Sequence, residues 1–479
     1  MKKQISIICI IGMLLAVGLS GCFEETKNIS QIVKSRTIYV DVNGGKDYTK
    51  IQDAIDTSSD GDIIFVYIGI YKEHLIINKS IILIGEDRDN TIITCNENFR
   101  DYSVVIVMAD GVTIENFTIT NSSSRMIDIG LGDVPGWITT AGVQILSNNC
   151  ILRNNRFQNN DEYGIWLQNS NNNTIINNII SNNTGGIYLK NSTLNLISGN
   201  RIFSGNDGII LAYYSDGNII QDNIISDCKY GAGIFFHSNS NNNTIEGNTI
   251  MNCLYWGIHF QSDIPHWLYL SENNIIYHNN FINNTYGVRD DYHNIWYNST
   301  LKEGNYWDDY NGTDANGDGI GDTPYNIHGE EGDNQDLYPL MSPIGVTVTT
   351  DKSEYEQNET INITMFNGLN VGIFSLAASW SPVFSIEQIE KKTSDGWQSF
   401  FATPQWPECD IDYDWPAEIK SGESVSFDWK PLIWISGCDN FIQAEPGVYR
   451  LVIYYQIREG NLSENWTWLT AYSNEFVII

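Results

Sequence analysis

A repeated unit runs through the middle of the chain and limits the folds that the chain can adopt. A glycine followed by alternating apolar residues recurs, mostly every 22 residues, at Gly142, Gly164, Gly186, Gly208, Gly233, Gly257 and Gly287. One unit of this kind cannot bury its own apolar side. The units must therefore stack on one another into a solenoid with a continuous core.

Alternation within each unit predicts which side chains face the core. The first and third residues after the glycine are aliphatic or aromatic, as in Ile165 and Leu167 or Ile187 and Leu189. The second and fourth residues are of mixed type. Because successive residues of a strand point to opposite sides, we expect the first set inside the solenoid and the second set outside.

A second strand in each unit carries an asparagine between two apolar residues, as in Ile175-Asn178-Ile180. Asparagine tolerates a left-handed backbone, and its amide both donates and accepts hydrogen bonds. We therefore predict that one asparagine per coil stacks into a ladder that satisfies backbone groups at a bend. The predicted rungs are Asn155, Asn178, Asn200, Asn223, Asn248 and Asn279.

The chain divides into segments of different pattern. Residues 1–22 read as a signal segment and 23–36 as a linker, and the solenoid extends over 37–343. A short amphipathic helix at Thr49 to Asp56 would cover its first coil with Ile51, Ala54 and Ile55. From about Val346 alternating strands replace the asparagine-rich coils, which predicts an immunoglobulin-like β-sandwich over 346–479.

The N-terminus has the order of a secretory signal. Lys2 and Lys3 precede an apolar stretch from Ile5 to Leu19 that is short for a membrane span. The following Ser-Gly-Cys22 resembles the lipobox of prokaryotic lipoproteins, which implies a lipidated Cys22 and attachment to the membrane through a lipid anchor only. The alternative is a plain signal peptide with an incidental cysteine.

Charge and cysteine content narrow the partners further. The 58 acidic and 26 basic residues give a net charge of −32, which would repel nucleic acid and anionic lipid. Cations and neutral glycans fit better, although the charge can also serve solubility alone. In a compartment that permits disulfides, Cys409 and Cys438 are the best candidates for a bridge in the C-terminal domain. Cys228 and Cys253, on adjacent coils, would bond or stack.

The repeats and the segments that flank them resemble the NosD-like branch of the pectate-lyase-like right-handed β-helix proteins. The resemblance covers most of residues 37–343. Its most specific part is the terminal segment 304–341, with Gly304-Asn305-Tyr306-Trp307-Asp308-Asp309-Tyr310 and the closing Asp336-Leu337-Tyr338-Pro339-Leu340-Met341. The fold expected is all-β, a right-handed parallel β-helix of about 22-residue coils followed by a β-sandwich.

One loop of this terminal segment has the pattern of a calcium site. Oxygen-bearing residues at positions one, three and five with glycine at six reproduce the first half of an EF-hand loop. The expected ligands are Asp314, Asn316, Asp318, the carbonyl of Ile320, and Asp322. Position twelve is Tyr325 rather than glutamate. We predict a structural calcium ion here, with an acidic turn that holds no metal as the alternative.

Aromatic residues on the outer positions suggest a ligand surface. Trp166, Tyr188, Phe235, Trp256 and His259 fall at or near corresponding places on successive coils. Stacked aromatic side chains offer a flat platform for sugar rings. The alternatives are a ladder that only stabilises the sheet, or a surface covered by a loop such as Asp128 to Thr140.

Three functions remain in view. The first is a non-catalytic binding or envelope role with surface or environmental polysaccharide as partner. The second is a polysaccharide lyase or glycoside hydrolase, for which Arg289, Asp290 and Asp291 are the only conspicuous outward group, and a weak one. The third, which the family resemblance implies, is an accessory protein that handles copper through His237 and His259, staggered by two positions on adjacent coils. The sequence favours the first.

Overall fold

The computed structural model describes most of the chain from residue 35 onward. The described residues are 35–95, 102–123, 126–128, 135–137, 139–261, 270–329, 334–369, 372–374, 388–393, 396–401, 418–420, 423–434, 441–458, 466–473 and 476–479. Cys22, Cys409 and Cys438 lie outside them, so the predicted lipidation and the predicted disulfide stay predictions.

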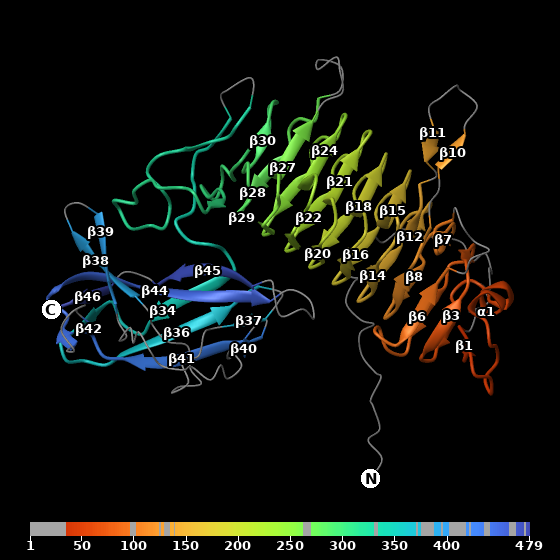
Figure 1. Ribbon diagram of the computed structural model, residues 1–479, viewed down its shortest axis with the longest axis horizontal. Coiled ribbons are helices and arrows are strands. Elements are labelled where there is room, and N and C mark those ends of the chain that lie inside the picture. The colour runs from red at the N-terminus through yellow and green to blue at the C-terminus, as the bar shows by residue number, and fades with distance from the viewer. Residues whose placement is uncertain are drawn as a thin grey trace, which may run out of the picture. The chain divides into compact units, whose positions relative to one another are not determined.

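Three parallel sheets, which we name A, B and C, form the solenoid, and each coil gives one strand to each sheet (Figure 1). Sheet A contains β1 (Thr37–Val40), β2 (Ile63–Val66), β5 (Ile82–Gly85), β8 (Thr113–Glu115), β13 (Ile151–Arg153), β16 (Thr174–Ile176), β19 (Leu196–Ser198), β22 (Ile219–Gln221), β25 (Thr244–Glu246) and β28 (Ile275–Tyr277). Sheet B contains β3 (Gly69–Lys72), β6 (Thr91–Thr94), β9 (Thr118–Thr120), β14 (Arg156–Gln158), β17 (Ile179–Ser181), β20 (Arg201–Phe203), β23 (Ile224–Ser226), β26 (Thr249–Met251), β29 (Asn280–Ile282) and β31 (Tyr306–Trp307). Sheet C contains β4 (Leu75–Ile77), β7 (Val105–Val107), β12 (Ala141–Ile145), β15 (Tyr163–Gln168), β18 (Gly185–Lys190), β21 (Asp207–Ala212), β24 (Ala232–His237), β27 (Trp256–Gln261) and β30 (Arg289–Asp290). This is the right-handed parallel β-helix that the sequence predicts.

The register of the strands confirms the predicted core. Ile165 pairs with Ile187, and Ile187 pairs with Ile209, on successive strands of sheet C. All three side chains are fully buried in one continuous apolar cluster. Residues from coils far apart in the sequence order thus become vertical neighbours, which is how a unit too small to bury its own apolar side is stabilised.

Lack of space explains the repeat glycines in the middle of the solenoid, whereas Gly287 has a positive φ of 67° and no close neighbour. A Cβ atom on Gly208 would lie 2.4 Å from the carbonyl oxygen of Gly233 and 2.4 Å from Cγ2 of Ile225. Gly186 is equally confined, 2.4 Å from the carbonyl oxygen of Gly208. Only a residue without a side chain lets successive coils approach this closely.

A helix covers the first coil, as predicted. Helix α1 spans Ile51–Thr57, and it buries Ile51, Ala54 and Ile55 in the same apolar cluster as the coils. The carboxylate of Glu73 accepts hydrogen bonds from the backbone N–H groups of Ile51 (2.9 Å) and Gln52 (3.0 Å). It therefore satisfies two donors that a helix N-terminus leaves without partners inside the helix.

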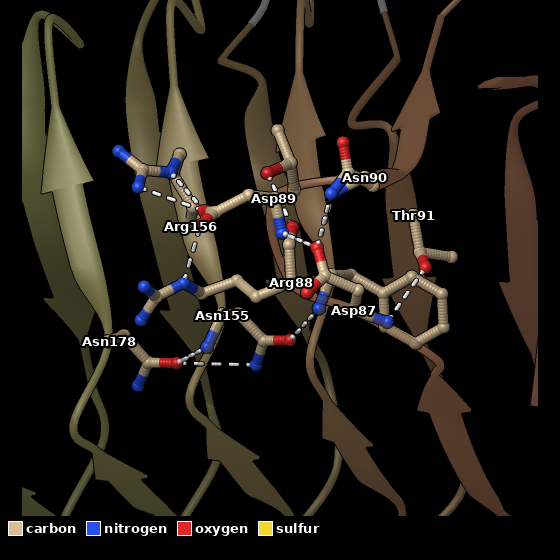
Figure 2. Close-up of polar contacts among 10 residues, drawn as sticks. Asp87, Arg88, Asp89, Asn90, Thr91, Asn155, Arg156 and Asn178 are labelled. Atoms are coloured by element: carbon tan, nitrogen blue, oxygen red, sulfur yellow. Dashed lines mark hydrogen bonds and ion pairs between the residues drawn. The ribbon is translucent and has the colours of Figure 1, made fainter. Parts of the chain in front are cut away.

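The predicted asparagine ladder is present and runs through the core side of the bends. Asn155 donates its backbone N–H and its side-chain Nδ2 to Oδ1 of Asn178, at 2.9 and 3.2 Å, as Figure 2 shows. The same pair of bonds links each rung to the next, from Asn178 through Asn200, Asn223, Asn248 and Asn279 to Asn305. Each rung thus satisfies both a backbone and a side-chain donor in a buried place.

A second, parallel ladder was not predicted. It begins with the backbone N–H of Cys150, which donates to Oδ1 of Asn173 at 2.8 Å. The ladder continues over Asn195, Asn218, Asn243, Asn274 and Asn294. The left-handed backbone positions belong to other residues, such as Asn154 and Asn177, which precede the rungs of the first ladder. The sequence interpretation had assigned both roles to one asparagine.

Both ladders end on a buried aspartate that also accepts an indole N–H. In the first, Oδ2 of Asp336 accepts from the backbone N–H of Asn305 at 2.7 Å and from Nε1 of Trp307 at 2.9 Å. In the second, Oδ1 of Asp290 accepts from Nδ2 of Asn294 at 2.9 Å, and its Oδ2 accepts from Nε1 of Trp296 at 2.8 Å. A carboxylate suits the last rung because it accepts without needing a further acceptor for itself.

On the outside of the early coils, an ionic contact ties a turn to sheet B. Oδ1 of Asp89 accepts from Nε of Arg156 at 3.1 Å and from Nη2 of Arg156 at 2.9 Å, and the guanidinium of Arg88 approaches the same oxygen (Figure 2). Burial acts to raise the pKa of Asp89, but hydrogen bonding and charge from the two arginines lower it overall. The pair is largely exposed, so its contribution to stability is small.

The C-terminal region contains two mainly antiparallel sheets. One consists of β34 (Val346–Thr350), β36 (Ile361–Asn367) and β41 (Ser424–Trp429). The other contains β35 (Glu354–Tyr355), β46 (Phe476–Ile478), β44 (Gly447–Arg458), β38 (Gln388–Thr393), β39 (Gly396–Phe401), β42 (Leu432–Trp434) and β43 (Phe441–Gln443), with β37 (Ile373–Phe374), β40 (Glu418–Ile419) and β45 (Trp466–Tyr472) beside this path. Ile363 of the first sheet and Leu451 of the second share one buried cluster. The immunoglobulin-like assignment stays a prediction.

Two short pairs of strands and the cysteines complete the description. The pairs are β10 (Met126–Asp128) with β11 (Pro135–Trp137), and β32 (Tyr325–Asn326) with β33 (Gln335–Asp336). Within the described ranges, Cys228 and Cys253 are free thiols, so these neighbours on adjacent coils form no disulfide bond. A thiol–thiol hydrogen bond with Cys253, together with burial, raises the pKa of Cys228 well above its usual value. No helix of the described part is long and apolar enough to cross a membrane.

Candidate functional site

The predicted aromatic stripe lies on the outer face of sheet C, but it is not a continuous platform. Trp166 pairs with Tyr188, and Phe235 pairs with His259, on adjacent strands. Ile210 occupies the row between Tyr188 and Phe235 and divides the stripe into two clusters. The ring centroids of Trp166 and Tyr188 lie 6.4 Å apart, and those of Phe235 and His259 lie 5.5 Å apart.

Burial restricts what the first cluster can offer to a ligand. Trp166 is only 9% exposed, and its Nε1 has no hydrogen-bond partner in the described structure. Tyr188 stacks on Tyr163 with ring centroids 4.7 Å apart, and burial raises the pKa of Tyr188 to about 12. These rings contact one another across adjacent strands, and cross-strand aromatic pairs of this kind stabilise a sheet. Of the five predicted sugar-binding residues, Trp256 is the one that lines the cleft described next.

That cleft lies at the last coils of the β-helix and has a volume of about 920 Å³. Its wall comes from β27, from the loop after β29, and from the segments around β30, β31 and β32. The lining residues are Trp256, Phe281, Asn283, Asn284, Thr285, Tyr286, Gly287, Arg289, Trp307, Asp308, Asp309, Tyr325, His328 and Gly329. Its size matches that of clefts that hold small molecules or short oligomers.

Aromatic rings form two parts of the wall. Trp256 and Tyr286 have ring centroids 5.2 Å apart, and Tyr286 is 51% exposed. Trp307 and Tyr325 are stacked with centroids 4.2 Å apart and planes 8° apart, and the hydroxyl of Tyr325 donates to Oδ2 of Asp309 at 3.2 Å. Trp307 is only 2% exposed and is stacked between Phe281 and Tyr325, so Trp256 and Tyr286 are the rings that can contact the apolar face of a sugar.

Two adjacent carboxylates give the cleft its charge. Asp308 accepts a hydrogen bond from the backbone N–H of Asn283. Desolvation of its carboxylate by neighbouring groups raises the pKa of Asp308, and the charge of Asp309 adds to the rise. Arg289 is the single Lys or Arg among the described lining residues, and its Nε donates to Oδ2 of Asp291 at 2.9 Å. The described lining residues therefore carry more negative than positive charge.

The structure corrects one feature of the proposed Arg289, Asp290 and Asp291 group. The sequence prediction placed the two aspartates as an outward acidic pair. Asp290 instead pairs in register with the core residue Phe260 and is 1% exposed, where it ends the second asparagine ladder. Burial raises its pKa to about 6, against the effect of its hydrogen-bond donors. Period-two alternation sends Asp290 inward, and Arg289 alone of the three lines the cleft.

The loop predicted to bind calcium uses its side chains internally. The carboxylates of Asp314, Asp318 and Asp322 all accept hydrogen bonds from backbone N–H groups of the loop, and Nδ2 of Asn316 donates to Asp318 at 2.9 Å. In the described ranges no three His, Cys, Asp or Glu side chains are grouped closely enough to hold a metal ion. Calcium binding through these groups and the carbonyl of Ile320 stays a prediction.

The calcium prediction is tested by thermal unfolding. Saturating calcium is expected to raise the Tm by about 2–4 °C, because a ligand that binds only the folded state stabilises it. Asp318→Ala should abolish the rise, and magnesium at equal concentration serves as the control. An equal Tm with calcium and with chelator would leave the loop as an acidic turn.

Comparison with known proteins places the chain in a family. Residues 55–312 match the family described as periplasmic copper-binding protein (NosD), which is more than half of the chain. The chain belongs to the NosD family. It is also 31% identical over 376 residues to a cell surface glycoprotein of Methanothermus fervidus, an alignment that covers 64% of this chain and 56% of that protein. This chain thus spans little more than half the length of that relative.

The solved structures to which the chain is similar include two lyases. Pectate lyase Pel9A is 14% identical with a TM-score of 0.43, over 59% of this chain and 82% of that one. The alginate lyase of Paenibacillus sp. str. FPU-7 is 16% identical with a TM-score of 0.40, over 53% of this chain and 88% of that one.

Among the described residues, His237 and His259 do not fit the copper that the family description names. Cupric and cuprous sites need clustered histidine, methionine or cysteine ligands. His237 is aligned with Gln261 and not with His259, and the ring of Phe235 lies 5.9 Å from His237 and 5.5 Å from His259. Burial, together with the charge of Arg289, lowers the pKa of His259 to about 4. The two imidazoles therefore do not face a common ion.

Sequence reasoning missed most of the cleft. Trp307, Asp308 and Asp309 stood in the segment that carried the family resemblance, but they were not assigned to a site. Tyr286 and Tyr325 were not singled out as ligand-binding residues either. Their signal was present as aromatic residues beside acidic ones after the last regular repeat. What was missing was the path of that irregular segment back across the end of sheet C.

Proposed function

We propose that this chain is an extracytoplasmic surface protein that binds carbohydrate in the cleft at the end of its β-helix. The observation that carries the proposal is the combination of the half-buried ring of Trp256 and the exposed ring of Tyr286 with hydrogen-bonding groups on Asp308, Asp309 and Arg289 around a cleft of about 920 Å³. Rings that stack on sugars and polar groups that bind hydroxyls are the usual complement of such sites.

The proposed extracytoplasmic location is supported by the family description, by the relative and by the N-terminal sequence. The family description names the periplasm, and the relative from Methanothermus fervidus is a cell surface glycoprotein. The N-terminal signal segment and the lipobox-like sequence at Cys22 add a membrane anchor through lipid to this proposal. Mass spectrometry of the membrane-bound protein would identify the modified cysteine.

Substitution of the cleft aromatics tests the proposal. Trp256→Ala and Tyr286→Ala are expected to weaken binding to the best polysaccharide of a screened panel by at least about tenfold, which corresponds to about 1.4 kcal/mol per substitution. Affinity electrophoresis followed by calorimetry measures this loss. Tyr230→Ala is the matched control, because Tyr230 is 75% exposed and lies outside the cleft.

The outcomes separate the candidate functions. An equal loss of binding in Tyr230→Ala, or no binding of any polysaccharide by the wild type, would refute the cleft proposal. Release of reducing ends or unsaturated products by the wild type would instead support a lyase or hydrolase that uses the same cleft. Circular dichroism of each variant confirms that the fold is intact.

A further inference from the structure

The charge of the cleft indicates which class of glycan it binds, an inference that rests on the proposed carbohydrate binding. Asp308 and Asp309 are neighbours in the sequence and both line the cleft. The hydroxyl of Tyr325 and the backbone N–H of Asn283 donate to them, which fixes their position without neutralising their charge. Both are exposed toward solvent and thus toward a ligand.

An acidic partner already offsets part of the positive charge of Arg289, the one Lys or Arg among the described lining residues. Nε of Arg289 is 2.9 Å from Oδ2 of Asp291, and the Asp291 side chain is only 17% exposed. A carboxylate from a ligand would have to compete with that fixed partner. It would also approach Asp308 and Asp309 in a molecule with a net charge of −32.

We infer that the cleft selects glycans with free amino groups, accepts neutral glycans, and rejects glycans built of uronic acids. An ammonium group on a sugar whose ring lies against Trp256 and Tyr286 meets the carboxylates of Asp308 and Asp309 across the same cleft. A neutral sugar keeps the ring contacts and loses only the charge interaction. A uronate lacks the favourable charge interaction and adds repulsion between like charges. Discrimination between amino sugars and uronates therefore arises from both attraction and repulsion.

Matched hexasaccharides test this inference on the complete secreted chain. The probes are the hexamers of glucosamine, N-acetylglucosamine, glucose and galacturonic acid, titrated by calorimetry at low and at high salt. The glucosamine hexamer is expected to bind at least tenfold more tightly than the glucose hexamer at low salt, and the difference should shrink at high salt. The galacturonic acid hexamer is expected to show no binding.

Charge-removing variants assign the effect to the cleft. Asp308→Asn and Asp309→Asn should each reduce the ratio of the affinity for the glucosamine hexamer to that for the glucose hexamer severalfold, because each removes one negative charge from the cleft. Asp53→Asn removes the same charge from the exposed face of α1 and should leave this ratio unchanged. Equal or tighter binding of the galacturonic acid hexamer would overturn the charge inference while carbohydrate binding stands. No binding of any hexamer would overturn the proposed function together with it.

Discussion

Asn223→Ala is expected to lower the free energy of unfolding by about 3–5 kcal/mol, because it removes a central rung of the first asparagine ladder and leaves buried polar groups without partners. Oδ1 of Asn223 accepts from the backbone N–H of Asn200 at 2.9 Å and from its Nδ2 at 3.0 Å. Nδ2 of Asn223 in turn donates to Oδ1 of Asn248 at 2.9 Å. All three residues are fully buried, so water cannot replace the lost partners.

Urea unfolding followed by circular dichroism measures this change. Asn43→Ala is the control, because Asn43 is exposed in a turn near the N-terminal end of the solenoid. If the two substitutions cost the same, the ladder does not stabilise the coils. Solenoids can lose cooperativity between repeats, so coincidence of fluorescence and circular dichroism transitions should be checked for each variant.

Asp336→Ala is expected to destabilise the last coils by a similar amount, about 3–5 kcal/mol, because one carboxylate satisfies several buried donors. Besides Asn305 and Trp307, the backbone N–H of Tyr338 donates to its Oδ1 at 3.0 Å. The glycine at position 304 leaves room for the Asp336 side chain, because a Cβ atom there would lie 1.8 Å from Oδ1 of Asp336. Burial raises the pKa of Asp336 to about 6 in spite of these donors.

A double-mutant cycle separates the Asp336 contact from general damage. Trp307→Phe keeps the ring but removes the indole N–H, and it should cost about 1–2 kcal/mol alone. In the Asp336→Ala background it should cost much less, since the donor no longer has its acceptor. Full additivity of the two substitutions would contradict the assigned hydrogen bond. Asp53→Ala, on the exposed face of α1, controls for loss of an acidic side chain.

The regular coils were predictable because one period repeats both the residue type and its environment. The alternation after Gly164 and Gly186 sufficed to place Ile165 and Ile187 inside, and stacking then fixed their neighbours without further information. The first asparagine ladder followed for the same reason. The second was overlooked because Asn173 and Asn195 precede an apolar run in the sequence, whereas Asn178 and Asn200 stand between two apolar residues.

The candidate site was less predictable because it is formed where the period ends. After Gly287 the chain no longer repeats, so spacing could not show that Asp308 returns beside Asn283 or that Tyr325 stacks on Trp307. The alternation rule still applied to Asp290, yet its position beside Arg289 and Asp291 suggested a surface group. The aromatic stripe was found in the right sheet, but burial of Trp166 depends on packing that a sequence pattern does not contain.

The stacked coils also make the length of the solenoid adjustable. Asn178 and Asn200, separated by 22 residues, occupy equivalent rungs with the same hydrogen bonds. Deleting or duplicating one such block would join equivalent residues and shift everything beyond it by about 4.8 Å along the axis. The cleft is made by the final turns alone and would travel with them unchanged. Changes of this kind would thus lengthen or shorten the solenoid in steps of one rung while they keep the cleft.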